Sequence, residues 1–118
     1  MVDMSREDFE RCVNDALDII PEEFLRLIDN VVVLVEDEPP EDEPPDLLGL
    51  YDGVALTERD SWWATGSLPD RLFIFRNPIL DLCDTREEVV EEVRITVLHE
   101  VGHYFGLDDE RIDELGYG

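Results

Sequence analysis

The sequence predicts a small α+β domain. Residues 5–30 and 85–115 carry apolar side chains at helical spacing, whereas residues 31–35, 47–56 and 62–76 are rich in β-branched and aromatic residues. No repeat or change of composition divides the 118 residues, so we expect a single domain over 1–118. The expected architecture is a small mixed β-sheet packed on one long helix, with additional N-terminal helices and a short C-terminal helix.

Two helices are predicted at the N-terminus. Ser5 can cap a first helix that runs to about Ile19, and Pro21 suits the first turn of a second helix that ends at Asn30. The residues that we expect to be buried are Phe9, Cys12, Val13, Ala16, Leu17 and Ile20 in the first helix and Phe24, Leu25, Leu27 and Ile28 in the second.

An acidic, proline-rich segment separates the first two predicted strands. Val31–Val35 is a continuous β-branched run, which is typical of a central strand. Residues 36–46 hold seven acids and four prolines, so we expect a solvated, partly extended or disordered loop. Either this loop is plain solvated surface, or it is an acidic arm for a basic partner. Residues 47–51 then have β character and lead to a turn at Asp52-Gly53.

Two further strand-like runs, residues 62–65 and 71–76, flank hairpin-loop residues 66–70. Residues Trp62, Trp63 and Ala64 lie in the first run. Two interpretations stay open for them: a platform on which an extended peptide adds to the sheet edge, or tryptophans that cover one end of the core.

A long helix is predicted from Thr85 to about Phe105. Thr85 and Glu88 form a capping-box pattern, and several glutamates lie in the first two turns, where the helix dipole favours them. The apolar stripe is broad, which places this helix at the centre of the fold. Its members are Val89, Val90, Val93, Ile95, Thr96, Val97, Leu98, Val101, Gly102 and Phe105.

The pattern H-E-x-x-H-x-x-G-x-x-D occupies residues 99–109 and contains both histidines of the chain. On a helix, His99 and His103 share one face and can bind one Zn²⁺. Glu100 then lies beside the metal, where it can accept a proton from the attacking water. Gly106 can end the helix, which allows the chain to bring Asp109 to the metal as a third ligand.

This pattern is specific. A bare H-E-x-x-H arises by chance in about one chain of this length in a few hundred, and the added Gly and Asp lower that to about 10⁻⁵. The alternative is two surface histidines on an amphipathic helix. Within the metal hypothesis, Asp108 could replace Asp109 as the ligand. Tyr117 or Tyr104 could donate to the developing oxyanion, although a tyrosine near the chain end is more often only packed or exposed. Arg111 is the nearest cation, and it more often serves as a salt-bridge partner, here for Asp108 or Glu114.

The charge of the chain excludes some partners. There are 32 acidic and nine basic residues, a net charge of −23, which disfavours nucleic acid and anionic membranes. Either this acidity favours cationic peptides or a basic partner, or it serves solubility and adaptation to salt. No signal peptide or membrane span is visible, so we expect a cytoplasmic protein in which Cys12 and Cys83 are free and buried.

The order of these elements resembles the small bacterial zincin-like metallopeptidase family, the minimal zincins. The likeness lies in residues 31–35, 47–53, 68–71, 84–85 and above all 99–115. It implies a single-domain zincin fold with one Zn²⁺ per chain. Carried onto this sequence, it implies that His99, His103 and Asp109 are the ligands and that Glu100 is the catalytic base.

Larger metzincins have a third histidine where this chain has Asp109, and a methionine-bearing turn after that ligand. Here nine residues follow Asp109, and the methionines stand at positions 1 and 4, so we expect a cleft without its lower side. Two functions therefore stay open. The first is a monomeric zinc peptidase that cleaves peptides or unfolded, basic segments, with Trp62, Trp63, Ala64 and Tyr117 as candidate substrate contacts. The second is a weakly active or inactive zinc-binding domain that recognises a protein partner.

Overall fold

The computed structural model describes residues 2–27, 31–53 and 70–104 and confirms the α+β class. Within these ranges no helix has the length and apolar character needed to span a bilayer. The described elements are α1 (Arg6–Asp18), α2 (Glu22–Leu27), β1 (Val31–Glu36), β2 (Gly49–Asp52), β3 (Asp70–Phe75), α4 (Arg76–Asp81) and α5 (Arg86–Tyr104).

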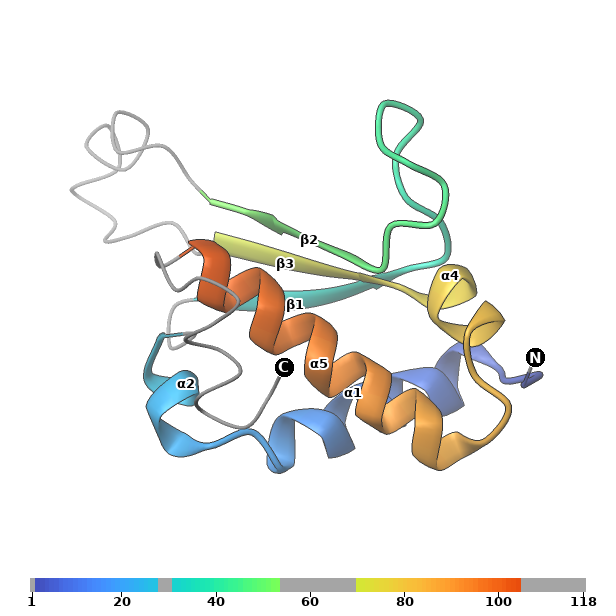
Figure 1. Ribbon diagram of the computed structural model, residues 1–118, viewed down its shortest axis with the longest axis horizontal. Coiled ribbons are helices and arrows are strands. Elements are labelled where there is room, and N and C mark those ends of the chain that lie inside the picture. Colours follow the sequence, from blue (N-terminus) through green and yellow to red (C-terminus); the bar gives the residue numbers. More distant parts are fainter. Residues whose placement is uncertain (1, 28–30, 54–69, 105–118) are drawn as a thin grey trace.

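The three described strands form one mixed sheet in the order β1-β3-β2 (Figure 1). β3 is parallel to β1 and antiparallel to β2, with Val33 opposite Leu72 and Leu50 opposite Phe73. The prediction that residues 31–35 form the central strand is wrong for these three strands, because β3 lies between the other two. Val32 is 41% exposed, so β1 does not have the two covered faces that its apolar run suggests.

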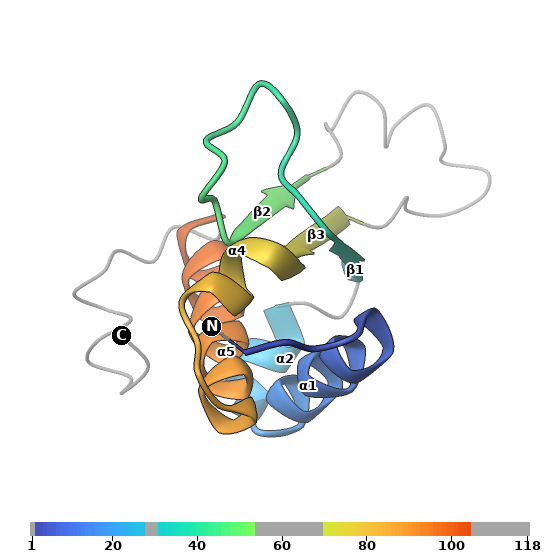
Figure 2. The ribbon, with the colours of Figure 1, turned by 90° about the vertical axis from the view of Figure 1, so that its right-hand side faces the viewer.

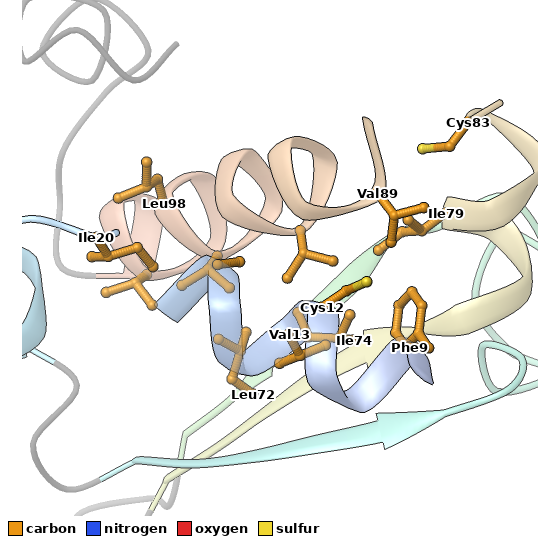
Figure 3. Packing of buried hydrophobic residues seen from close by; sticks show 14 of the residues in the cluster. Phe9, Cys12, Val13, Ile20, Leu72, Ile74, Ile79, Cys83, Val89 and Leu98 are labelled. Atoms are coloured by element: carbon orange, nitrogen blue, oxygen red, sulfur yellow. The ribbon is translucent and has the colours of Figure 1, made fainter. Parts of the chain in front are cut away.

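Helices α1 and α5 pack together beneath the sheet (Figures 1 and 2). Leu72 and Ile74 of β3 are fully buried, and Figure 3 shows them meeting side chains from α1 and α5. Burying each such side chain is worth about 1.5–3 kcal/mol. The buried core cluster consists of Phe9, Cys12, Val13, Ala16, Ile20, Phe24, Leu72, Ile74, Ile79, Leu80, Cys83, Val89, Val93, Val97, Leu98 and Val101.

The N-terminal helices follow most of the predicted pattern, although Leu17, which was expected to be buried, is only partly buried. Ser5 caps α1, and its Oγ accepts a hydrogen bond from the Asp8 amide at 3.2 Å. In α2, Phe24 is buried but Leu25 is 37% exposed, so its expected burial is wrong. A helix of six residues presents too few positions to the core to bury both neighbours. The expected burial of Leu27 and Ile28 falls outside the described side chains.

Helix α4 begins directly after β3 and was not predicted. Its N-cap, Phe75, makes no side-chain capping bond, so the sequence carries no capping signal for it. The helix forms because Pro78, Ile79 and Leu80 are all buried. Cys12 and Cys83 are free and buried, which confirms that prediction.

Candidate active site

The site is built on α5, which is fixed at its start by a reciprocal capping box. The Thr85 Oγ1 accepts a hydrogen bond from the Glu88 amide at 3.2 Å, and the Glu88 Oε1 accepts from the Thr85 amide at 3.1 Å. The same Glu88 oxygen accepts from the Asp84 amide at 2.8 Å. The predicted capping box of Thr85 and Glu88 is therefore confirmed. The helix continues without a break to Tyr104, so positions 99 and 103 stand one turn apart on it.

Two neighbouring faces of α5 have different roles. Val89, Val93, Val97 and Val101 repeat every four residues and are at most 1% exposed, so this row lies in the core. The adjacent row lines a cavity. Its described members are Glu92, Ile95, Thr96, His99 and Glu100.

The cavity that contains His99 and Glu100 has a volume of about 380 Å³. One side is α5. The other side comes from residues far away in the sequence, at the end of the acidic loop and the start of β2. The described residues on that side are Pro44, Asp46, Leu47, Leu48 and Gly49. Two segments that are far apart in the sequence, residues 44–49 and 92–100, therefore flank His99 and Glu100, in a volume typical of small-ligand sites.

Gly49 allows β2 to lie directly on α5. A Cβ at position 49 would lie 2.6 Å from the Thr96 Cγ2, 3.0 Å from the Phe73 carbonyl oxygen and 3.7 Å from the Glu100 Cγ. Thr96 is held in turn, because its Oγ1 donates to the Glu92 carbonyl oxygen at 2.8 Å. A residue without a side chain at position 49 thus sets how closely the sheet approaches Glu100.

The acidic loop between β1 and β2 is anchored at both ends to three consecutive residues, 75–77. At its start, the Arg76 Nε donates to the Asp37 Oδ1 at 2.9 Å, and the Asn77 Nδ2 donates to the Glu38 Oε1 at 2.5 Å. At its end, the Phe75 amide donates to the Leu48 carbonyl oxygen at 3.0 Å.

Backbone bonds within the loop form two turns, from Glu43 to Pro40 at 3.0 Å and from Leu47 to Pro44 at 3.1 Å. The expectation of a solvated loop is confirmed, because most of residues 36–46 are exposed, but parts of it form turns rather than extended or disordered chain. The loop lies between β1 and β2 (Figure 2), and its last residues form one side of the cavity.

Several arginines of the described residues form ion pairs elsewhere. On α5, Arg94 donates to Glu91 and thereby lowers the pKa of that carboxyl group. The side chain of Arg71 pairs with Asp52 across β3 and β2. None of these four residues lines the cavity. Its described ionisable side chains are His99, Glu100, Asp46 and Glu92.

The donor set fits a zinc ion as far as the structure describes it. His99 is on the cavity row of α5, and position 103 continues that row one helical turn later. Imidazole nitrogen is a preferred ligand of Zn²⁺, and a pair at i and i+4 on an unbroken helix is a suitable frame. Among the described side chains no three His, Cys, Asp or Glu residues gather as a metal site, and His99 is the one predicted ligand with a described side chain.

The structure brings two of the predicted site residues, His99 and Glu100, to one cavity. The backbone of His103 lies in α5, and its side chain is outside the description. Several further predictions lie outside the described residues. They are the ligand Asp109 and its alternative Asp108, the substrate contacts Trp62, Trp63, Ala64 and Tyr117, and the nearby cation Arg111. The side chain of Tyr104 is also outside the description.

The other residues that line the cavity were not predicted from the sequence. Glu92 and Thr96 precede His99 by seven and three residues, so helical spacing alone could have placed them on its row. Asp46, Leu47 and Leu48 had no such signal, because their place depends on how the loop is anchored to Phe75.

Comparisons with known proteins bear on the fold and on the family of the chain. A solved structure of a conserved hypothetical protein from Thermus thermophilus has the same fold, with a TM-score of 0.57 and 24% sequence identity over 86% of this chain and 94% of that chain. No curated protein matches the chain. Residues 28–118 match the family described as zincin-like metallopeptidase. This match covers most of the sequence and includes every element around the cavity, and the chain therefore belongs to the zincin-like metallopeptidase family.

Proposed function

We propose that the protein hydrolyses peptide bonds in peptides or unfolded protein segments, with Glu100 as the general base. The observation that carries this proposal is that His99 and Glu100, adjacent in the motif, both line a cavity formed by α5, β2 and the acidic loop. Such a cavity can receive a peptide next to the catalytic pair. Membership of the metallopeptidase family supports the same reaction class.

His99, His103 and Asp109 would hold one zinc ion in this proposal. When bound, Zn²⁺ supplies Lewis-acid polarisation of the peptide carbonyl and makes water easier to deprotonate near neutral pH. An adjacent glutamate that does not bind metal distinguishes a catalytic site from a structural zinc site.

Glu100 moves the proton. Its carboxylate accepts a proton from the attacking water and then donates it to the nitrogen of the leaving amine. Gly49 and Thr96 hold β2 against this part of α5, which limits where the Glu100 side chain can lie. The lining of the cavity is partly apolar, so a bound peptide would displace water from around the pair and strengthen the electrostatic interactions there.

The test compares zinc-loaded wild type with Glu100→Gln on a quenched fluorescent peptide library. We expect the substitution to lower kcat/KM by about 10²–10⁴-fold, since it removes the proton acceptor and keeps the shape of the side chain. The control is Glu87→Gln, which changes an exposed glutamate in the first turn of the same helix. If wild type binds zinc but hydrolyses no peptide, the peptidase proposal is wrong and recognition of a protein partner becomes the better hypothesis.

A further inference from the structure

We propose that the cavity beside His99 is a specificity subsite for an arginine or lysine side chain of the substrate. This inference rests on the proposed peptidase function and deepens it, because it names the substrate class. It depends on four properties of the cavity: its lining, its distance from His99 and Glu100, the anchoring of its loop, and the lack of ion pairs for Asp46 and Glu92 among the described residues.

The lining matches a long side chain with a cationic end. Leu47, Leu48 and Ile95 are apolar residues of the lining, and Asp46 and Glu92 are acidic residues of it, one from the loop and one from α5. Arginine and lysine have an apolar stem and a charged head, and they bind best where both parts find a partner. A short or wholly apolar side chain would leave the carboxylates without a function.

The subsite lies close enough to act on residues next to the cleaved bond. Glu92 precedes His99 by seven residues on α5, which corresponds to about 10 Å along the helix axis. Three residues of extended peptide span about the same distance. The cationic residue is therefore expected within three positions of the bond that Glu100 attacks.

Asp46 and Glu92 form no ion pair with an arginine of the described chain. Other carboxylates do so: Arg76 and Arg6 pair with Asp37, and Arg86 pairs with Asp15. Since no ion pair engages Asp46 or Glu92 within residues 2–27, 31–53 and 70–104, these two carboxylates are available to a ligand cation.

The loop that carries Asp46 is already ordered. Its start is bound by Arg76 and Asn77, and its end by the Phe75 amide. A preformed site loses less conformational entropy on binding, so a modest ion pair contributes more to selectivity. The net charge of −23 adds a long-range attraction for cationic peptides, which raises their association rate but does not choose a position within the peptide.

The experiment uses peptide pairs that differ at one position, with arginine in one and neutral, similarly shaped citrulline in the other. Each pair is assayed for hydrolysis by zinc-loaded wild type and, by fluorescence anisotropy, for binding to zinc-loaded Glu100→Gln. At one position within three residues of the cleaved bond, we expect arginine to be preferred over citrulline by about tenfold. This is the combined effect expected of two partly exposed ion pairs.

The double variant Asp46→Asn/Glu92→Gln is expected to reduce this preference to less than twofold. The matched control, Glu41→Gln/Asp42→Asn, removes the same charge from two exposed residues of the same loop that do not line the cavity, and it should keep the preference. Single variants at Asp46 and Glu92, checked by thermal unfolding, show whether a loss comes from misfolding.

The outcomes separate the two proposals. Hydrolysis without an arginine preference overturns the subsite and leaves the peptidase function standing. An equal loss of preference in the control variant also overturns the subsite, because the attraction would then be a property of the whole surface. No hydrolysis, together with arginine-selective binding that the cavity variant abolishes, supports the subsite and overturns the peptidase function.

Discussion

Gly49 of β2 and Thr96 of α5 lie so close together that a Cβ at position 49 would be 2.6 Å from the Thr96 Cγ2. This contact joins the sheet to the helix that carries the H-E-x-x-H motif, and Thr96 precedes Glu100 by four residues. It gives the first prediction, because a single methyl group is enough to disturb it.

Gly49→Ala should lower the free energy of unfolding by about 1–3 kcal/mol, since the added methyl group overpacks a full contact. Thr96→Ser removes the opposing Cγ2 but keeps the hydroxyl that donates to the Glu92 carbonyl oxygen. The double variant should therefore recover part of the loss, with a coupling of about 0.5–2 kcal/mol in a urea-unfolding cycle. The Phe73 carbonyl oxygen, 3.0 Å from the new Cβ, limits the recovery. Strictly additive losses would show that the two residues do not act through this contact.

Arg76 is predicted to hold the acidic loop in place. Its side chain, only 20% exposed, donates to Asp37 at 2.9 Å and to the Met4 carbonyl oxygen at 2.8 Å. Arg76→Ala should cost about 1–3 kcal/mol of stability and speed both hydrogen exchange and proteolysis in residues 37–48. Arg71→Ala is the control, because its pair with Asp52 is exposed and should cost less than about 1 kcal/mol. Unchanged exchange in the loop of Arg76→Ala would contradict the anchoring role.

Zinc stoichiometry tests the ligand set independently of activity. We expect about one Zn²⁺ per chain in the wild type and in Glu100→Gln. His99→Ala, His103→Ala and Asp109→Ala should each weaken binding by more than about 100-fold, since even residues that only orient ligands cost about 10–100-fold. Competition with a chromophoric chelator measures these affinities. Tight binding retained in Asp109→Ala but lost in His103→Ala would remove Asp109 from the ligand set and direct attention to Asp108.

The stability of the fold should decrease in alkali because of Cys83. Burial raises the pKa of its thiol to about 11 from an ordinary value of 9.0, and the nearby carboxylates Glu92, Glu88 and Asp84 add to the shift. Between these two pH values the unfolded chain loses this proton and the folded chain keeps it, so the free energy of unfolding falls as the pH rises. The full contribution is present below pH 9 and amounts to about 1–3 kcal/mol.

Urea unfolding at intervals from pH 8 to pH 11 measures this slope. Cys83→Ala should reduce the slope, and the smaller part that remains includes Cys12, whose pKa is also raised by burial. An identical slope in wild type and Cys83→Ala would assign the alkaline instability to other groups.

Local sequence signals determined much of this protein. The capping residues Ser5, Thr85 and Glu88 act within one helical turn, so their roles could be predicted without a fold. The spacing of apolar residues in α1 and α5 predicted which face each helix buries, because 3.6-residue periodicity is a property of the segment itself. The prediction of a zinc site at residues 99–109 likewise depends only on local spacing, because both histidines lie within one helical turn.

Only the tertiary structure decided what surrounds that motif. The position of β3 between β1 and β2 depends on pairing between distant strands, and the apolar run of β1 alone favoured the wrong order. Helix α4 forms because its residues find a core to enter, although its N-cap is poor. The composition of the acidic loop predicts a solvated segment. Bonds from Phe75, Arg76 and Asn77 fix both of its ends, so that its last residues form one side of the cavity. Asp46 therefore lies across the cavity from Glu92 through long-range contacts, for which a linear sequence has no periodic signal.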